Sequence, residues 1–379
     1  MTTPPVDRTH GRRVLFLEPW LGGSHRILSD AWASRSRHRV EVEGLAPRHW
    51  RWRQEASGWE LARLVAGDPP PDVLVVSDFV DLPRLLGFLP ANWAGVPTIA
   101  YFHENQLTYR PGGSGTAVPE DAHAAFANVL TALRADQVVF NSSFHRDDLA
   151  AAGDRYLRTL PRPSPRAEFA AAMESAHVVA PAPDLEAVPP GPGRPDGEAL
   201  RVLFPHRLEE DKDPMSFARA VGAAARRGAR IEVALTGGEP ERARGEALDA
   251  LALLGPHLVS AGMRERGDYL ELIGTCDVVA STARHEFFGI AVAEAMAAGC
   301  APLLPDRLNY PALVEGLPAA ERTRALFSGE DDLADELVRR AGAPLHDRDP
   351  ARRAERRSAV LHLDAAHCVE ALDRIVDEA

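Results

Sequence analysis

Short runs of apolar residues alternate with longer amphipathic stretches along most of the chain. In the first half the apolar runs end in polar side chains and lie at residues 12–19, 72–79, 96–105 and 136–143. The alternation restarts with apolar runs at residues 199–207, 229–238, 256–263, 277–284 and 300–305. Buried strands separated by helical patterns are typical of parallel sheets with helices on both faces. The sequence therefore predicts an α/β fold with two doubly wound, Rossmann-like domains that face each other across a cleft.

A segment rich in proline and glycine separates the two halves, and a chain of 379 residues is too long for one ordinary core. We predict an N-terminal domain at 1–185, a linker at 186–198 and a C-terminal domain at 199–345. The remaining residues, 346–379, have a helical pattern, and we expect this segment to cross back to the first domain. Open α/β sheets bind ligands at the carboxyl ends of their strands, so we expect the site there.

The composition excludes several classes of protein. A net charge of −12 argues against a general nucleic-acid coat or a membrane-surface protein, although a local basic patch remains compatible with it. The three cysteines have no metal-type spacing, which fits a reducing compartment, and we expect no metal ion. The N-terminal residues lack the apolar stretch of a signal peptide, and no run of about 18 apolar residues occurs. We therefore expect a cytoplasmic protein with no membrane partner.

The stretch RLEEDKDP contains Lys212, the only lysine among the 43 basic residues of the chain. Arg207 and Lys212 lie five positions apart, just after a predicted strand. Two cations at that place can clamp a diphosphate, the arginine as a planar fork and the lysine as a compact charge. The alternative is a solvated turn with local salt bridges. Every other basic residue among these 43 is an arginine, so a solvated turn is expected to carry arginine as well. A tight site for an ammonium group therefore explains Lys212 better than the solvated turn does.

The stretch HEFFGIAVAEAMAAGCAP, residues 285–302, predicts a strand end, a turn and a helix. Glu286 lies in the turn and Glu294 about two turns into the helix, so the two carboxylates can bind different parts of one long ligand. The free amides of Phe288 and Gly289, at the start of the helix, suit a phosphate group. The alternative is an ordinary helix with acidic residues near its start.

Two loops of the first domain carry further candidates. Gly22 and Gly23 follow the first strand, and glycines there let the backbone approach a phosphate or a sugar closely. The loop is not GxGxxG, so a dinucleotide cofactor is not indicated. His103 and Asn105 end a buried strand, where polar residues face the expected cleft. The alternative for His103 is a histidine hydrogen-bonded within its loop.

Residues 47–64 mix arginine with tryptophan, which suits unstacked RNA bases. The residues concerned are Arg48, Trp50, Arg51, Trp52, Arg53 and Trp59. A membrane-interface helix and an amphipathic helix with tryptophan in the core are the alternatives. We expect a second basic run to be a solvated helix face; it comprises Arg352, Arg353, Arg356 and Arg357.

Several blocks of the sequence together resemble the tRNA-queuosine mannosyltransferase family, whose members are retaining glycosyltransferases of the GT-B fold. The blocks are LGGSH, PRHWRWR, YFHENQLTY, VVFNSSFH, PHRLEEDKDPMSF and STARHEFFGIAVAEA. The resemblance implies transfer of mannose from GDP-mannose to queuosine at the wobble position of an aspartate tRNA. It implies no cofactor and no metal ion.

The resemblance also implies roles for individual residues. Arg207 and Lys212 would hold the donor diphosphate, Glu286 the hydroxyls of the donor sugar, and Glu294 the ribose of the nucleotide. The first domain would lie on the acceptor side and the second would bind the sugar nucleotide.

Three further positions would lie near the reacting groups according to the same resemblance. The amides of Phe288 and Gly289 would face the phosphate or the sugar, the loop at 22–23 would approach the reaction centre, and His103 would lie near the donor sugar. Two other functions remain open from the sequence. One is a GT-B glycosyltransferase that uses another sugar nucleotide and a lipid or small-molecule acceptor, and the other is a non-catalytic protein that binds sugar nucleotides or RNA.

Overall fold

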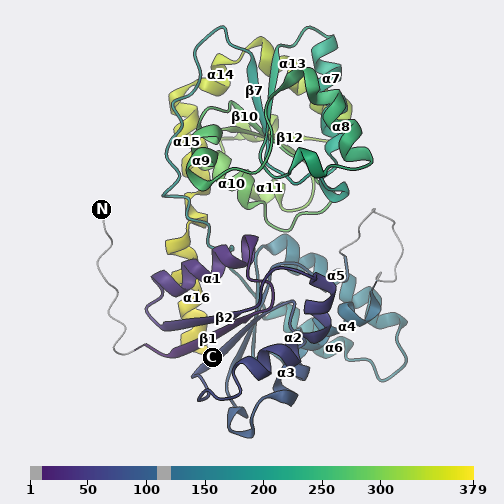
Figure 1. Cartoon of the computed structure of the whole chain (residues 1–379), viewed down its shortest axis with the longest axis vertical. Helices are drawn as coiled ribbons and strands as arrows, with labels where there is room; N and C mark the ends of the chain where they lie inside the picture. The colour runs from purple at the N-terminus through teal and green to yellow at the C-terminus, as the bar shows by residue number, and fades with distance from the viewer. Residues whose placement is uncertain (1–10, 109–120) are drawn as a thin grey trace. The chain divides into compact units, whose positions relative to one another are not determined.

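The computed structural model describes residues 11–108 and 121–379. Residues 1–10, on which the expected lack of a signal peptide depends, and Tyr109 of the YFHENQLTY block lie outside this part. The described chain forms two compact units (Figure 1). Unit 1 contains residues 11–108, 121–184 and 365–379, and unit 2 contains residues 185–364.

Unit 1 is built on a six-stranded parallel sheet with the strand order β2-β1-β3-β4-β5-β6. The strands are β1 (Arg13–Glu18), β2 (Arg39–Gly44), β3 (Val73–Ser77), β4 (Thr98–Phe102), β5 (Gln137–Phe140) and β6 (His177–Val178). Every residue of β3 and β4 is buried, as expected for central strands covered on both faces. The chain winds outward from β1 to β2 and then in the other direction through β3, so the strand order reverses between β1 and β3.

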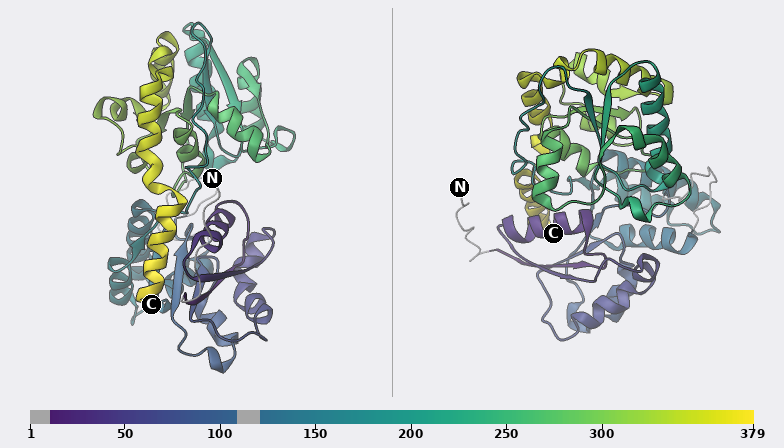
Figure 2. Two further views of the ribbon diagram at one scale, coloured as in Figure 1. Left: turned by 90° about the vertical axis from the view of Figure 1, so that its left-hand side faces the viewer. Right: turned by 45° about the horizontal axis from the view of Figure 1, so that its top comes forward.

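Helices cover the sheet of unit 1 and shield its core. They are α1 (Gly23–Arg35), α2 (Trp50–Leu64), α3 (Leu82–Phe88), α4 (Ala122–Arg134), α5 (Ser143–Thr159), α6 (Arg166–Glu174) and the last helix, α16 (Ala365–Glu378). Helix α16 packs against α1 (Figure 2). Its Asp373 accepts hydrogen bonds from Trp32 Nε1 (3.0 Å) and Ser36 Oγ (2.6 Å). The C-terminal segment thus divides at Asp364, and only its second part belongs to unit 1.

Unit 2 repeats the plan, with the strand order β12-β11-β10-β7-β8-β9 and all pairs parallel. The strands are β7 (Leu200–Phe204), β8 (Ile231–Leu235), β9 (Leu258–Ser260), β10 (Val278–Ala280), β11 (Ala301–Pro305) and β12 (Leu326–Phe327). The helices are α7 (Pro214–Arg226), α8 (Glu246–Leu254), α9 (Arg266–Gly274), α10 (Ile290–Ala297), α11 (Tyr310–Leu313), α12 (Ala319–Ala325), α13 (Glu330–Gly342), α14 (Leu345–Arg348) and α15 (Pro350–Val360). Here the strand order reverses between β7 and β10.

Three strands are not predicted by the apolar runs. Strand β2 is an edge strand in which Val40 and Val42 alternate with charged residues, so it contains no continuous apolar run. Strands β6 and β12 have only two residues each and also lie at sheet edges. The prediction of two doubly wound α/β domains is confirmed.

The predicted linker at 186–198 is not a free connection, because it is fixed to the surface of unit 2. The amide of Gly191 donates to the carbonyl of Ala298 (2.9 Å), and a Cβ at Gly191 would lie 2.2 Å from the carbonyl oxygen of Gly274. Arg194 donates to Glu232 on β8 (2.6 Å). The proline and glycine content reflects close backbone packing here.

The second basic run is not a solvated helix face, and that prediction is wrong. On α15, Arg353 and Arg356 are buried. Arg353 donates to the carbonyl of Ala298 (3.0 Å), and Arg356 donates to Glu321 (3.1 Å) and to the carbonyl of Asp347 (2.8 Å). Helix ends leave carbonyls without intrahelical partners, and these guanidinium groups satisfy them.

Among the described residues, no helix is both long enough and apolar enough to cross a membrane.

Candidate functional site

The first candidate site lies in unit 2, where the strand order reverses between β7 and β10. His206 follows β7 and Ser281 follows β10, and His206 Nε2 lies 2.8 Å from Ser281 Oγ. Ser281 Oγ lies 2.7 Å from the Tyr310 hydroxyl. Burial and the nearby Lys212 ammonium lower the pKa of His206 to about 4, so this histidine is neutral. The chain therefore joins the two strand ends by a buried, uncharged network at the place where open α/β sheets bind ligands.

Lys212 ends a short 3₁₀ turn (Glu210–Lys212) beside this network. Its ammonium group donates to the carbonyl of His285 (2.6 Å) and lies 3.1 Å from Asp211 and 3.4 Å from Glu286. The side chain is only 12% exposed. Three oxygens around one small cation match the three donors of an ammonium group. The ammonium group is thus enclosed by three oxygens in a small, largely buried space.

Glu286 is the anionic partner of Lys212. Burial favours the neutral acid, but the Lys212 charge outweighs it and lowers the pKa of Glu286 from 4.5 to about 2. The other oxygen of Glu286 accepts from the amide of Phe288 (3.3 Å). The Phe288 amide is therefore not free, which corrects the expectation for this group. Asn309 donates to the Phe288 carbonyl (3.0 Å) and so fixes the turn on both sides.

The helix that carries Glu294 starts later than expected. Gly289 has a φ of 97° and caps α10, which begins at Ile290, so Glu294 lies little more than one turn into the helix. Its buried carboxylate accepts from Arg266 (2.7 Å) and from the hydroxyl of Tyr269 (2.9 Å), both on α9. Each carboxylate oxygen has two acceptor positions, so Glu294 can accept further hydrogen bonds. Gly289 must be glycine, because its left-handed backbone strains other residues.

Arg207 differs from these residues because it is largely exposed. Its side chain is 66% exposed and pairs with Glu209 (3.1 Å), not with the oxygens that surround Lys212. A guanidinium on an exposed loop can reach an anion without breaking buried contacts. An anion at Lys212, in contrast, must share the ammonium with Asp211 and Glu286.

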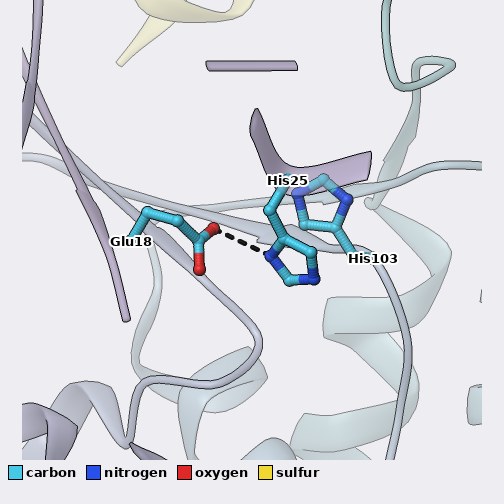
Figure 3. Close-up of side chains that lie close together, drawn as sticks. All are labelled: Glu18, His25 and His103. Atoms are coloured by element: carbon cyan, nitrogen blue, oxygen red, sulfur yellow. Dashed lines mark hydrogen bonds and ion pairs between the residues drawn. The ribbon is translucent and has the colours of Figure 1, made fainter. Parts of the chain in front are cut away.

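The second candidate site lies in unit 1, where the strand order reverses between β1 and β3 (Figure 3). Glu18 ends β1 and is fully buried, and its Oε2 lies 3.0 Å from Nδ1 of His25 on α1. Its Oε1 accepts from Ser77 Oγ (3.1 Å) at the end of β3. Burial alone would lower the pKa of His25, but the Glu18 carboxylate outweighs it and raises this pKa to about 9. Glu18 and His25 thus form a buried ion pair.

His103 follows β4 and stacks on this pair. Its ring centroid lies 3.9 Å from that of His25, with 27° between the ring planes. Its amide donates to Asp78 Oδ1 (2.7 Å), and its carbonyl accepts from Asn141 Nδ2 (2.7 Å). Both ring nitrogens and Asp78 Oδ2 are buried and make no hydrogen bond within the described residues. The alternative of a histidine hydrogen-bonded through its ring within the loop is therefore wrong.

The cluster of Glu18, His25 and His103 has the composition of a metal site but not the geometry of one. One ligand atom from each residue lies within 4.8 Å of the others. However, ligands must aim their lone pairs at one point about 2 Å away, and stacked imidazole rings direct theirs along nearly parallel planes. Glu18 Oε2 is also already used by His25. We therefore describe the cluster as an ion pair with a stacked ring.

The other candidates in unit 1 differ in their surroundings. Gly23 has a φ of 55°, and a Cβ at this position would meet no atom within 4 Å, so its backbone is open to a ligand, whereas a Cβ at Gly22 would meet Pro47 at 2.7 Å. Asn105 is fully buried, and its Oδ1 accepts from the amides of Leu107 (3.1 Å) and Thr108 (3.0 Å). Asn105 shapes this turn and has no surface for an RNA contact.

The tryptophans of α2 face outward. Trp50, Trp52 and Trp59 are exposed, so the alternative of a tryptophan core is wrong. The buried side of the helix consists of Leu61 and of small residues at positions 56–58 and 62. Arg51 lies over the ring of Trp50 (5.1 Å) and Arg63 over that of Trp59 (5.3 Å).

Not all basic residues near α2 are equally available to a ligand. Arg53 forms an ion pair with Glu60 and is neutralised. Within the described residues, Arg48, Arg51 and Arg63 form no ion pair.

Several residues of the two sites are absent from the sequence-based predictions. They are Glu18, His25, Asp78, His206, Arg266, Tyr269, Ser281 and Tyr310. Glu18, Asp78, His206 and Ser281 carry a signal in the sequence, because each lies at the end of a predicted strand, as His103 does. Arg266 and Tyr269 lie on a helix without a distinctive pattern and carry no such signal.

Comparison with known proteins gives matches over both units. Residues 13–182 match the family model of the tRNA-queuosine alpha-mannosyltransferase N-terminal region, and residues 191–357 match that of glycosyl transferases group 1. The tRNA-queuosine alpha-mannosyltransferase of Drosophila melanogaster is 31% identical over 307 residues, which cover 79% of this chain and 80% of that protein.

Solved structures show the same fold at low sequence identity. Sucrose-phosphate synthase from Thermosynechococcus elongatus superposes with a TM-score of 0.72 at 15% identity, over 97% of this chain and 99% of that chain. Anabaena HepE in complex with UDP and glucose superposes with a TM-score of 0.68 at 16% identity, over 97% of this chain and 100% of that one. The fold is the GT-B fold of glycosyltransferases.

Proposed function

Because the chain belongs to the tRNA-queuosine alpha-mannosyltransferase family, we propose that it transfers mannose from GDP-mannose to queuosine in the anticodon of tRNA(Asp) in the cytoplasm. We further propose that the anomeric carbon keeps its configuration. The observation that carries this proposal is the 31% identity to the Drosophila protein across both units. Two features of the structure support it: the site of unit 2 presents groups for a sugar nucleotide, and helix α2 of unit 1 exposes basic and aromatic side chains.

In this proposal Lys212 and Arg207 bind the donor diphosphate. Lys212 is a fixed charge in a site that is 12% exposed, where its interaction with an anion is little screened. Arg207 can close over the same anion from an exposed position. The backbone after Gly289 adds the positive end of the α10 dipole. As the bond to the sugar breaks, these groups stabilise the growing negative charge on the leaving phosphate.

The two glutamates would hold the uncharged parts of the donor. Glu286 stays ionised at neutral pH because Lys212 lowers its pKa, so it can accept hydrogen bonds from sugar hydroxyls beside the diphosphate. Glu294 is held by Arg266 and Tyr269 and has acceptor positions left for the ribose hydroxyls.

No metal ion or cofactor enters the proposed reaction. The departing phosphate oxygen takes the proton of the acceptor hydroxyl on the same face of the sugar, so bond breaking and bond making conserve the configuration. The protein contributes by positioning the two substrates and by stabilising charge.

For the tRNA we propose the exposed face of α2. Trp50 and Trp52 offer rings for unstacked bases, and the nearby Arg48 and Arg51, which form no ion pair with the described part of the chain, offer guanidinium groups for phosphates. Arg53 contributes less, because Glu60 already neutralises it.

A donor experiment tests this proposal. Purified protein is incubated with queuosine-containing tRNA and, separately, GDP-mannose, GDP-glucose, UDP-glucose or UDP-N-acetylglucosamine, with and without EDTA. The tRNA is digested and its nucleosides are analysed by mass spectrometry, and the anomeric configuration of the product is read by NMR. We expect an α-linked hexose on queuosine with GDP-mannose alone and the same rate in EDTA. Transfer from a uridine nucleotide only, a β-linked product, or loss of activity in EDTA would each contradict a stated part of the proposal.

A further inference from the structure

The buried ion pair of unit 1 is held from three sides. Glu18 Oε1 accepts from the amide of Trp20 (2.8 Å) and from Ser77 Oγ (3.1 Å), and Oε2 binds His25 Nδ1 (3.0 Å). Glu18 is fully buried, and Phe79 packs edge-on against the His25 ring with centroids 5.6 Å apart. A carboxylate fixed in this way fixes the imidazole bonded to it. The expected cost of burying two charges indicates that the pair has a use beyond stability.

The ion pair contacts His103. The face of the His25 ring lies against His103, with 27° between the rings (Figure 3). The other titratable groups around His103 are Tyr101, whose ring centroid lies 4.7 Å away, Asp78 at its amide, and His145 on α5. Glu104 is the next residue along the chain and lies near His25 and Asp78. A cation stacked on an imidazole in a buried site opposes a second positive charge on that imidazole.

We propose that Glu18 and His25 are positioning residues for glycosyl transfer: they hold His103 as an uncharged ring whose two nitrogens bind hydroxyl groups of the substrates. This inference rests on the proposed glycosyltransferase function and names residues that the sequence-based prediction did not include. Burial and the charges of His25 and His145 lower the pKa of His103, in agreement with the geometry.

The charge state decides what His103 can bind. A neutral imidazole has one donor and one acceptor nitrogen, whereas an imidazolium has two donors. Sugar and nucleoside hydroxyls both donate and accept, so an uncharged ring can accept a hydroxyl proton and donate to a second oxygen. Neither nitrogen of His103 has a hydrogen-bond partner within the described residues, and the backbone bonds to Asp78 and Asn141 set the direction of the side chain. The ring is therefore prepared for a ligand.

The first test does not depend on the reaction. Protein labelled with ¹⁵N in its histidines is titrated by NMR, and His103→Asn and His25→Phe variants assign the two signals. We expect a protonated His25 at pH 7 that loses its proton at a pH of about 9, and a His103 that stays neutral and in one tautomer from pH 8 down to pH 5.5. A His103 imidazolium at pH 7, or a neutral His25, would overturn the inference whatever the substrate is.

The second test uses transfer kinetics over the same pH range. Glu18→Gln keeps a hydrogen bond to His25 but removes the charge that protonates it. The pKa of His103 then rises, and we expect kcat/KM to fall as the pH decreases from 8 to 6, where the wild-type profile stays flat. His25→Phe keeps an aromatic ring next to His103 but removes the positive charge and the hydrogen bond to Glu18. We expect kcat to fall by about 10²-fold with little change in KM.

His38→Phe is the matched control, because His38 is also buried in unit 1 but bonds to Arg12 and Asp373 instead of His103. For His38→Phe we expect the wild-type kcat, corrected for the folded fraction, and a kcat/KM that does not change with pH between 8 and 6. Equal losses in the His38 and His25 variants would assign a merely structural role to His25. The zinc content of both proteins is also measured. One zinc ion per wild-type molecule and none in Glu18→Gln would show that the cluster binds a metal ion, and this result would also overturn the inference. Absence of transfer by the wild type, with the NMR result as expected, would refute only the proposed function.

Discussion

Replacing Lys212 with methionine is predicted to reduce transfer far more than it reduces stability, and both effects follow from the contacts of the ammonium group. The pKa of Glu286 is lowered from 4.5 to about 2, a change of about 2.5 units that corresponds to ~3 kcal/mol of interaction at neutral pH. This pKa is depressed, so the contribution to stability is present above pH 4.5 and is lost as the pH falls through 2. Burial opposes this shift, and Lys212 is the largest of the causes that lower the pKa, so at pH 7 the variant loses most of this contribution and the expected decrease in Tm is up to ~6–12 °C for a domain of this size.

The effect on the reaction has a second origin. Without the ammonium group, the carboxylates of Asp211 and Glu286 face the diphosphate with no compensating charge, and a stabilising group for the leaving phosphate is gone. Loss of one such group reduces kcat by about 10²–10³-fold. Lys212→Arg is the matched control, because it keeps the charge but places a larger, planar group between the His285 carbonyl and Glu286. We expect it to fold better than the methionine variant and still to lose about tenfold in kcat/KM.

The assay is radiolabelled mannose transfer to queuosine-containing tRNA at 20 °C, well below the expected melting transition, with Tm measured by differential scanning fluorimetry on the same samples. A methionine variant that is folded and has kcat/KM close to the wild-type value would refute the assignment of Lys212 to the diphosphate. A variant that loses activity only in proportion to its unfolded fraction would refute it equally.

Three other changes test separate parts of the account. Glu294→Gln removes the anionic acceptor on α10, and we expect Kd for GDP-mannose, measured by calorimetry, to rise about tenfold, while the tRNA affinity is unchanged. Trp52→Ala removes an exposed ring of α2, and we expect the KM for tRNA to rise about 5–150-fold with donor hydrolysis unaffected, since stacking on one base contributes about 1–3 kcal/mol. Arg356→Met removes the partner of Glu321 Oε2, while Arg352 still binds Oε1 (2.7 Å), and we expect unit 2 to lose about 1–3 kcal/mol of stability, measured by urea unfolding, with little change in KM for either substrate.

The sequence predicts the fold because the fold depends on patterns that are local. Each central strand is a continuous apolar run, as in Val73–Ser77, and each run is followed by a helical stretch. Edge strand β2 lacks this signal because its two valines alternate with charged residues. The packing of the linker against unit 2 and the burial of the arginines of α15 are not predictable, for one shared reason. The sequence shows where glycine, proline and arginine occur, but it does not show which distant group each of them contacts. Gly191 and Arg353, for example, both donate to the carbonyl of Ala298.

The candidate site of unit 2 is predictable in part. Lys212, Glu286 and Glu294 stand out by type and spacing, and the structure brings Lys212 and Glu286 to 3.4 Å. The role of Arg266 depends on a contact between two helices, which no local pattern encodes. In unit 1, His103 is predicted by its place at a strand end. Its stacking on His25 depends on how α1 leaves β1, and only the structure shows it.

The dependence of transfer on queuosine is the most direct test of the central claim. The wild-type protein is incubated with GDP-mannose and tRNA(Asp) purified from two sources, cells that make queuosine and cells that cannot, and the digested nucleosides are weighed by mass spectrometry. We predict a hexose on queuosine in the first sample and no modified nucleoside in the second. Equal hexose incorporation in both samples, or none in either while GDP-mannose is still hydrolysed, would contradict the account of the acceptor.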